Sequence, residues 1–583
     1  MRASVLGVFL LTGVLGIYSQ IALAFNVRVD CENRDVKNNV EALINPIKDS
    51  TSAVVRQAYR AAIAQAARRG IEALGFYQYH LRFRWEEHSS GDPKKATLIA
   101  TIELGAPVRI KDASFIVSGE ASDDRHFRAL KRRLPKSGDQ LNHGTYEDFK
   151  SRVQNLAMDR GYFDGKFTRQ ELGVDAANNE AFWWLHYESG PRFRMSGVHF
   201  SGSQIREDIL QNLVPFKSGD PYQSTDISEL NRRLTATGWF GSVVVSPQIS
   251  EGKKDPEKYL PVTAEVTPKS RNIVQTGLGY STDVGPQGKL TWTKPWINDA
   301  GHAIEAATKV SAYEQQFDAS YKIPLPTNAL EEYYLVQGGV KREDLNDTQS
   351  NNATLLISRN WDRYEGWKRS VNLRAMFDSF DQGLSSHSTM LVYPGVSFSR
   401  TRSRGGLMAS WGDSQRYTVN WSNEWWGSDV DFLVLEAQHV LIRTYARRHR
   451  FILRSRIGWM ETDDFEKVPP DLRFFAGGDR SVRGYDYESI SPRDSQGNLT
   501  GAEKLVTASI EYQYRITGKW WGAIFFDAGE AVHDFGDTDI KKGAGLGIRW
   551  ASPLGAIRFD VAKPVGDPTE NGIQIYIGLG PEL

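Results

Sequence analysis

The sequence lacks most of the features that mark soluble enzymes and nucleic-acid-binding proteins. Its 583 residues include one cysteine, Cys31, so no disulfide can form within the chain. Basic and acidic side chains balance at 71 each, which removes the positive surplus typical of nucleic-acid binding. The first half of the chain contains no HExxH motif, no phosphate-binding P-loop and no nucleophile elbow. We therefore expect no covalent catalysis, no metal, no cofactor and no nucleic-acid partner.

Long apolar runs are also absent once the N-terminus is passed. The N-terminus itself predicts a signal peptide over residues 1–24. It combines a positive charge at Arg2, an apolar core at Val5–Ile17 and small residues at Ala22–Ala24. No later segment holds the roughly 18 uncharged apolar residues that a membrane helix needs. Cys31 lies beyond the expected cleavage site, and we interpret it as an incidental buried thiol.

The first half of the chain contains a tandem repeat. Three helix-like segments end in a glycine followed by two aromatics, at Gly75–Tyr77, Gly161–Phe163 and Gly238–Phe240. A glycine there is typical of a helix C-cap, and we expect the aromatics to open the next strand. Each unit reads as strand, helix, helix, strand, strand, over roughly 80 residues. We predict three small α/β modules at residues 25–105, 106–190 and 191–268, which serve either as docking modules or as spacers.

Residues 269–583 read as strands of about ten residues with a period of two. Apolar-out, polar-in alternation fits a membrane barrel with a wet lumen, although a soluble sandwich would alternate in the same way. The expected signal peptide, the regular hairpin spacing and aromatics near strand ends favour the barrel. At roughly 20 residues per strand and connection, this region predicts a transmembrane antiparallel β-barrel of about 16 strands. The alternation is clearest in Ala544–Trp550, Ala556–Ala562 and Gly572–Gly580, and the strand-end aromatics include Trp292, Trp296, Trp425 and Trp426.

The connection between the strand-like segments 450–460 and 504–516 has an unusual composition. Its stretch Arg473–Tyr485 is rich in glycine, yet it carries three arginines and three aromatics. One interpretation is a surface loop with a basic patch. The other is a loop that folds into the lumen, where glycine permits tight backbone paths, Arg483 forms charge-assisted bonds and Tyr485 provides packing area.

Two of the later strands offer such a loop a place to dock. Alternation in residues 505–516 turns Glu511 towards the lumen. Alternation in residues 524–529 does the same for Phe525, Asp527 and Gly529. Arg483 would then pair with Asp527 or Glu511 and lie over Phe525.

These segments resemble the paired motifs of a known family. The run Val482, Arg483, Gly484, Tyr485 resembles the lumen-entering loop motif of the BamA/TamA insertase superfamily, and Phe525–Gly529 resembles the FxDxG strand motif that receives it. The three repeats resemble POTRA domains, and together with the C-terminal ending they are most similar to TamA-like members. BamA has a five-module arrangement, and two-partner secretion transporters have two modules with a plug helix, so neither count fits. The chain ends on Leu583, which departs from the aromatic last residue common in outer-membrane proteins.

The resemblance implies a function and a location. It implies an outer-membrane protein with periplasmic N-terminal domains that assists the insertion of client barrel proteins such as autotransporters. It also implies a TamB-type, inner-membrane-anchored partner and contact with outer-membrane lipid. Three other functions stay open, namely a secretion pore, a passive diffusion channel and a structural bridge across the periplasm.

Closure of the expected barrel depends on the first strand, residues 272–282, meeting the last, residues 572–580. Both contain residues that pair weakly in a β-ladder, since glycine packs little and proline cannot donate a ladder bond. These residues are Gly277 and Gly279 in the first strand, and Gly578, Gly580 and Pro581 at the last. We expect few hydrogen bonds at this seam, so that it opens sideways and offers an edge to client strands. Alternatively, Pro581 only ends the strand and the glycines make room for lumen side chains.

Overall fold

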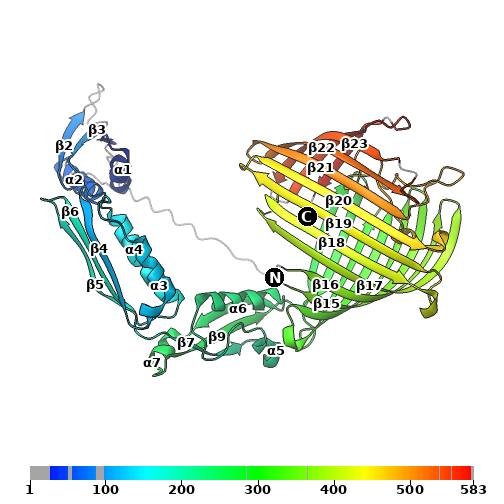
Figure 1. The fold of residues 1–583 in the computed structure, drawn as a ribbon, viewed down its shortest axis with the longest axis horizontal. Helices are drawn as coiled ribbons and strands as arrows, with labels where there is room; N and C mark the ends of the chain where they lie inside the picture. The colour runs from blue at the N-terminus through cyan, green and yellow to red at the C-terminus, as the bar shows by residue number, and fades with distance from the viewer. Residues whose placement is uncertain are drawn as a thin grey trace, which may run out of the picture. The chain divides into compact units, whose positions relative to one another are not determined.

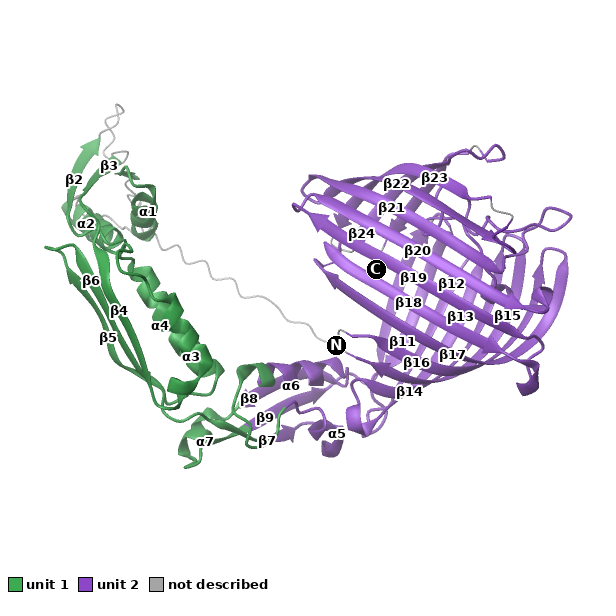
Figure 2. Ribbon diagram, viewed as in Figure 1, with its two compact units in different colours: residues 1–197, 216–226, 247–261 green, residues 198–215, 227–246, 262–583 purple. Residues whose placement is uncertain are grey.

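The computed structural model describes residues 26–49, 56–86, 97–283, 285–363, 366–406, 408–536, 539–552, 555–570 and 572–579. The expected signal peptide lies outside these residues. Three small three-stranded sheets precede a single sheet of 16 strands (Figure 1). The chain divides into two compact units, and the second contains the large sheet together with parts of the third small domain (Figure 2). None of the described helices has the length and apolar character needed to cross a bilayer.

Each small domain follows the order strand, helix, helix, strand, strand, and its sheet has its last strand in the middle. In module 1 the first strand runs parallel to the central strand and the second runs antiparallel to it. Its elements are β1 (Asn26–Asp30), α1 (Arg34–Asp49), α2 (Arg56–Glu72), β2 (Tyr79–Glu86) and β3 (Thr97–Leu104). The two helices cover one face of the sheet with aliphatic side chains such as Val40 and Ile63, which are fully buried. Cys31 is half-buried at the edge of this core.

Modules 2 and 3 repeat the same plan with extra short helices. Module 2 contains β4 (Arg109–Ser118), α3 (Arg125–Leu130), α4 (His143–Asp159), β5 (Lys166–Asp175) and β6 (Glu180–Glu188). Module 3 contains β7 (Arg194–Ser201), α5 (Glu207–Gln211), α6 (Ser224–Ala236), β8 (Phe240–Pro247), α7 (Ile249–Lys254) and β9 (Tyr259–Pro268). The α4 helix begins where the Asn142 side chain accepts hydrogen bonds from the backbone N–H groups of Gly144 and Thr145.

The three repeated glycines lie just after the long helices in a left-handed conformation. Their φ angles are +85° at Gly75, +81° at Gly161 and +74° at Gly238, a region that favours glycine. The expectation that the following aromatics open the next strand is correct for Phe240, which begins β8. It is wrong for the first two modules, where the aromatic pair precedes the strand. In these two modules the aromatic pair lies in the segment that connects the helix to the next strand.

In the first two of these glycine–aromatic–aromatic motifs, the aromatic residues pack at the junctions between modules. The hydroxyl of Tyr77 lies 2.8 Å from Nε2 of His143, the first residue of α4. The ring of Phe163 packs 5.2 Å from Phe193 and 5.0 Å from Tyr222, measured between ring centroids. Burial, together with the nearby Asp124 carboxylate, raises the pKa of Tyr162 to about 12, so this tyrosine stays neutral. The repeated sequence signal therefore marks the joints of the tandem array.

The large sheet is an antiparallel meander in which each strand pairs with its neighbours in sequence. Its first eight strands are β10 (Ile273–Ser281), β11 (Gly285–Lys294), β12 (Ala303–Ser311), β13 (Glu314–Pro324), β14 (Glu332–Leu345), β15 (Thr348–Asp362), β16 (Lys368–Gln382) and β17 (Ser385–Arg404). The remaining strands are β18 (Trp411–Ser422), β19 (Phe432–Tyr445), β20 (His449–Thr462), β21 (Lys504–Thr517), β22 (Trp520–Val532), β23 (Lys541–Ser552), β24 (Gly555–Pro564) and β25 (Gln574–Leu579). The prediction of POTRA-like modules followed by a barrel of about 16 strands is confirmed.

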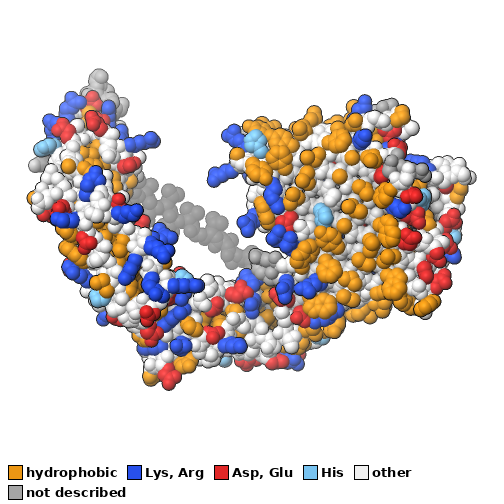
Figure 3. Space-filling view, viewed as in Figure 1, with side chains coloured by type: hydrophobic (Ala, Val, Ile, Leu, Met, Phe, Trp, Pro, Cys, Tyr) orange, Lys and Arg blue, Asp and Glu red, His pale blue; other side chains and the backbone are white. Residues whose placement is uncertain are grey.

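Apolar side chains cover the outer wall of the barrel and polar ones face its lumen. In β24 the outward Phe559 and Val561 are exposed, whereas Arg558 and Asp560 are buried inside. Figure 3 shows exposed hydrophobic side chains spread over the wall that faces the viewer. An outward apolar surface of this extent is typical of a barrel embedded in lipid.

Part of module 3 packs directly against one end of the barrel. The indole Nε1 of Trp239 donates to the carbonyl of Gly301, in the turn between β11 and β12, at 3.0 Å. Gly301 has a φ of +73°, and a Cβ at this position would overlap the Trp239 ring. The side chain of Asn212 donates to the carbonyl of Pro326 at 2.8 Å, in the next turn at the same end. These contacts attach the module to the end of the barrel at which β10 begins.

Candidate functional site

The connection between β20 and β21 fills part of the barrel interior. It contains the short 3-10 turns η6 (Phe465–Lys467) and η7 (Pro470–Leu472) and then the predicted loop motif. Val482 and Tyr485 are buried in one hydrophobic cluster with lumen-facing residues of the wall such as Tyr393 and Phe432. We call residues 473–490 of this connection the lumen loop.

A buried arginine fixes the base of the lumen loop. Arg473 donates three hydrogen bonds of 2.7–2.8 Å to the backbone carbonyls of Glu466, Val468 and Thr500. Its guanidinium also lies 4.6 Å from the centroid of the Phe465 ring. A single side chain thus links the beginning of the connection, at Glu466 and Val468, to its end at Thr500, because a guanidinium carries five donors in a fixed plane.

Arg483 is the centre of the candidate site. Its Nε and Nη2 donate to the two carboxylate oxygens of Asp527 at 2.7 and 3.0 Å, a bidentate pair. Its Nη1 donates to Glu511 at 2.8 Å and to Asp560 at 3.3 Å. The guanidinium carbon lies 3.4 Å from the centroid of Phe525, so the cation stacks on the ring. The structure therefore brings together four residues singled out in the sequence and adds Asp560.

A second arginine from the barrel wall completes the charge balance. Arg549 on β23 contacts Glu511 at 2.7 Å and Asp560 at 2.5 Å, and its side chain is fully buried. Arg454 on β20 lies 3.7 Å from Glu511. Three arginines thus meet the three carboxylates of Glu511, Asp527 and Asp560 in the lumen. Burying so many charges is tolerable only because each has partners of opposite sign and directed hydrogen bonds.

Sequence reasoning missed Arg549 and Asp560 as parts of this network. Both lie at inward positions of strands whose alternation is plain in the sequence, which is the signal that could have found them. Their contacts with Glu511 depend on how β21, β22, β23 and β24 align side by side. Asp560 lies opposite Gly547 of β23, and Glu511 opposite Phe525 of β22.

Strand β23 presents glycines to the lumen where the loop and its partners lie. A Cβ at Gly543 would overlap the carbonyl oxygen of Arg483, and one at Gly545 would overlap the ring of Phe525. A Cβ at Gly547 would overlap the Asp560 carboxylate and the Arg549 guanidinium. The alternating glycines therefore form a flat strip on which the loop backbone and the charge network rest.

We expect a Gly543→Ala change to displace the lumen loop. The added methyl group meets backbone rather than a flexible side-chain end, so overpacking should destabilise the docked loop by about 1–3 kcal/mol. Gly522→Ala on β22 is the matched control, since its Cβ would meet only Ile516, at an ordinary 3.4 Å. Limited proteolysis of the folded barrel measures the effect. Equal cleavage of the two variants within the loop would contradict this role of Gly543.

The remaining motif residues connect the loop to the last strands. The N–H of Gly484 donates to the hydroxyl of Tyr576, which in turn donates to the carbonyl of Tyr485 at 2.7 Å. The hydroxyl of Tyr485 donates to Asp567 at 3.1 Å. Gly484 has a φ of +107° and lies against the backbone of Lys563, which leaves no space for a side chain. The loop thus holds on to both β24 and β25.

The loop also reaches the beginning of the sheet. The carboxylate of Asp479 accepts from Arg558 of β24 at 2.8 Å. The backbone N–H of Asp479 donates to Asp283, just after β10, at 3.2 Å. One loop residue therefore contacts the segment just after the first strand of the barrel sheet and the last strand but one.

The glycines predicted for loop docking and for the seam lie next to residues of the barrel strands. A Cβ at Gly529 would overlap Thr507 and the carbonyl oxygen of Val506 on β21, so this glycine permits close packing between β21 and β22. Gly578 makes room for the Arg558 guanidinium, as the alternative interpretation has it. Gly277 and Gly279 lie on β10 opposite Lys289 and Gln287 of β11. Gly580 and Pro581 lie outside the described residues.

The sheet does not close through a hydrogen-bonded ladder among the residues that the structure describes. Strand β25 lies next to β10, but the order of paired strands runs from β10 to β25 without a pairing between these two. β25 is a six-residue strand and pairs with β24 from Gln574 to Leu579. By contrast, β16 pairs with β17 along its whole length, from Lys368 to Gln382.

In the described parts of the chain, no group of three or more His, Cys, Asp or Glu residues has the geometry of a metal site.

Comparison with known families gives matches to most of the chain. A family model for the Omp85 superfamily domain matches residues 272–582. A model described as POTRA domain, TamA domain 1, matches residues 26–104. A POTRA model described as a surface antigen variable number repeat matches residues 193–269.

Individual relatives are distant in sequence. The outer membrane protein assembly factor BamA of Nitratidesulfovibrio vulgaris is 24% identical over 389 residues, which cover 64% of this chain and 48% of that protein. BamA of Neisseria meningitidis serogroup B is 19% identical over 565 residues, which cover 83% and 68%. The chain thus spans about half the length of the first of these relatives. The crystal structure of BamA from Haemophilus ducreyi lacking POTRA domains 1–3 has a TM-score of 0.67 at 14% identity, over 81% of this chain and 99% of that one. That likeness shows a shared fold.

Proposed function

Because the chain belongs to the Omp85 superfamily, with a barrel in the outer membrane and POTRA domains in the periplasm, we propose that it assists other barrel proteins to insert into that membrane. It does so without making or breaking covalent bonds. The observation that carries the proposal is the seam, where β10 and the short β25 are neighbours without a ladder among the described residues.

The physical basis of the activity is the strand edge. Unpaired backbone N–H and C=O groups at an edge are a template for pairing with another chain. Inside a bilayer an unpaired edge is costly because lipid cannot satisfy these groups. A client strand that pairs with such an edge therefore gains hydrogen bonds as it enters the membrane, which lowers the barrier to its insertion.

A passive pore or a secretion channel explains less of what is observed. The lumen loop packs into the interior and is held by buried arginines, so the lumen is partly occupied. Planar-bilayer conductance of the parent and of a variant without the loop would measure how far the lumen conducts.

The test of the proposal is deletion of the gene followed by quantitative profiling of outer-membrane proteins. We expect a subset of barrel proteins to fall in abundance, and we propose that autotransporters are among them. The proteins should recover when the parent gene is restored. An unchanged outer-membrane profile would refute the assembly role.

Module 1 is proposed to bind an inner-membrane-anchored partner of the TamB type, while module 3 couples to the barrel. The support is chain order, in which module 1 comes first and module 3 directly precedes the barrel, and the contacts of Trp239 and Asn212 with barrel turns. Removal of residues 26–104 should leave a folded, heat-modifiable barrel but abolish co-purification of the partner. A Trp239→Ala variant serves as the comparison, because it should weaken the barrel junction and leave partner capture intact. Capture of the partner by the truncated chain would place the contact on another module.

A further inference from the structure

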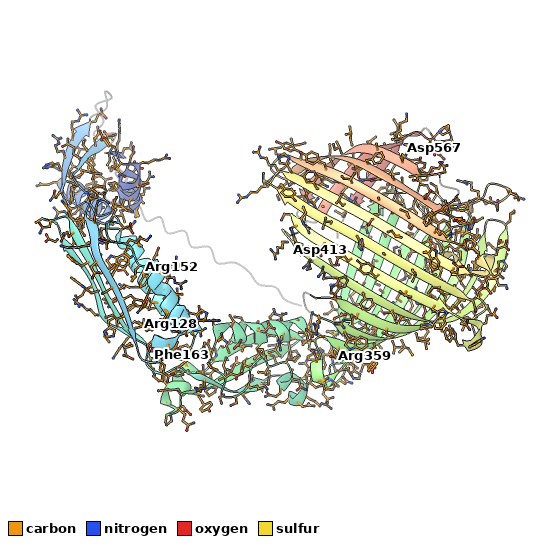
Figure 4. All side chains as sticks on the ribbon, viewed as in Figure 1. Arg128, Arg152, Phe163, Arg359, Asp413 and Asp567 are labelled. Carbon is orange, nitrogen blue, oxygen red and sulfur yellow. The ribbon has the colours of Figure 1, made fainter. Side chains whose placement is uncertain are left out.

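The outer wall of the barrel carries a group of four arginines at one end of β17, β18 and β19. The group, here called the arginine cluster, consists of Arg400, Arg402 and Arg404 on β17 and Arg443 on β19, with Trp411 and Asp413 of β18 between them. The register places Arg402 opposite Asp413, and Arg404 and Arg443 on either side of Trp411. Figure 4 labels Asp413 at one end of its strand.

The cluster faces outwards and begins where the apolar wall ends. Residues two apart in a strand share a face, and the same face of β17 carries the exposed Phe398 just before Arg400. On β18 the same face carries the exposed Tyr417 and Val419, which lie further along the wall from this end than Trp411 and Asp413. The cluster therefore lies at the boundary of the apolar band.

This boundary is the periplasmic one. In an up-and-down meander, even-numbered strands from β10 to β18 begin at the same end of the sheet. Four residues separate the end of module 3, at Pro268, from the start of β10 at Ile273, and Trp239 of module 3 contacts the same end of the sheet. Since β18 begins at Trp411, the cluster lies at the periplasmic leaflet.

The cluster has more positive charge than its protein partners can neutralise. Asp413 is buried and accepts two hydrogen bonds from Arg402, at 3.1 and 2.9 Å, while Arg400 lies 3.9 Å from it. Within the described parts of the chain, no carboxylate forms an ion pair with Arg404 or Arg443. One carboxylate thus faces four guanidinium groups.

Aromatic stacking holds the guanidinium groups in place. The Trp411 ring centroid lies 5.4 Å from the guanidinium carbon of Arg402, 5.2 Å from that of Arg404 and 4.7 Å from that of Arg443. Stacking on a ring face orients a guanidinium but leaves its N–H donors, which point along the plane, available to a planar anion. Arg443 also donates from Nη1 to the carbonyls of Gly412 and Ile442, which restricts it further.

A comparison with another turn at this end shows what is unusual here. Arg359, also labelled in Figure 4, stacks between Tyr334 and Trp361 but forms an ion pair with Glu332. Its charge is therefore balanced within the protein. The arginine cluster combines the same stacking with an unbalanced charge.

We propose that the arginine cluster binds the phosphate group of an anionic phospholipid in the periplasmic leaflet. A cation on the lipid-facing wall is costly at the middle of the bilayer and tolerated at its interface, where lipid phosphates lie. Guanidinium groups form directed, charge-assisted bonds with phosphate oxygens. Three cations oriented by one indole, with one carboxylate among them, provide a place for such an anion at the depth of the lipid headgroup.

The test compares lipid selection by three forms of the full chain. Each is purified in detergent and equilibrated with equal amounts of phosphatidylglycerol and phosphatidylcholine, and native mass spectrometry counts the lipids retained. The test variant carries Arg404→Gln and Arg443→Gln, which remove two cations without breaking an ion pair. We expect its preference for phosphatidylglycerol to fall by roughly fivefold for each cation removed.

The matched control carries Arg447→Gln and Arg448→Gln, in the exposed turn between β19 and β20 at the same end. It should keep the preference of the parent. Heat-modifiable migration in gels verifies that all three forms fold. Equal selection by the parent and the test variant would overturn the proposal, and so would an equal loss in the control, which would indicate general surface charge. Release of the bound lipid by inorganic phosphate at matched concentration would also overturn it, because the site would then bind free anions.

Discussion

An Arg483→Ala variant is expected to release the lumen loop and to lose most of its activity in barrel assembly. The change leaves Asp527 buried without its bidentate guanidinium partner, and only the backbone N–H of residue 483 can still donate to this carboxylate. Removing one member of a buried ion pair costs about 3–5 kcal/mol, because an uncompensated charge stays behind. Here the remaining arginines, Arg549 and Arg454, still contact Glu511, so the loss should fall on the loop and spare the barrel wall.

The matched control for this variant is Arg480→Ala in the same loop. Arg480 is exposed, so its truncation should change loop stability by only a few tenths of a kcal/mol. Protease cleavage within residues 473–490, gel migration of the barrel and outer-membrane protein profiles are measured for both variants. If Arg483→Ala resists protease and supports assembly as well as Arg480→Ala does, the anchored loop has no part in function.

Locking the seam with a disulfide is expected to stop client insertion completely, and reduction should restore it. In a Cys31→Ser background, cysteines are paired between Thr276, Leu278 or Tyr280 of β10 and Ile575 or Ile577 of β25. These positions have the outward phase of their strands, so the cysteines avoid the loop contacts of Tyr576. Several pairs must be tried, because a disulfide requires Cβ atoms about 3.5–4.5 Å apart.

The control is a disulfide between strands that already pair. Phe559 of β24 lies opposite Ile577 of β25 and both side chains point outwards, so cysteines at these positions should cross-link without affecting insertion. Insertion of a reporter barrel protein is followed in oxidised and reduced samples. Full activity of an efficiently locked β10–β25 pair would exclude sideways opening as the mechanism.

The sequence predicts well those features that depend only on which face of its own strand a residue occupies. Arg483, Asp527, Glu511 and Phe525 could be proposed as neighbours because period-two alternation assigns each strand residue to one face. The modules were also visible from a local signal, since a glycine with positive φ follows the second helix of each module. Each of these signals is contained within a few consecutive residues.

What could not be predicted depends on register across strands. The contact between Glu511 and Arg549 joins β21 to β23, and it exists only for one alignment of three strands. Sequence alternation leaves that alignment open, because it is unchanged when a strand slides by two residues. The burial of Asp413 likewise depends on register, because Arg402 pairs with its carboxylate from the directly opposite position on β17.

The order of paired strands, which starts at β10 and stops at β25, makes the described sheet a rolled ribbon rather than a ring. A ring of fixed circumference can accept another strand only by breaking an existing ladder first. A ribbon can lengthen at its free margins while each ladder from β10 to β25 stays intact. The lumen loop contacts Asp283 near one margin and Arg558 near the other, so we expect it to limit how far the ribbon could unroll during client insertion.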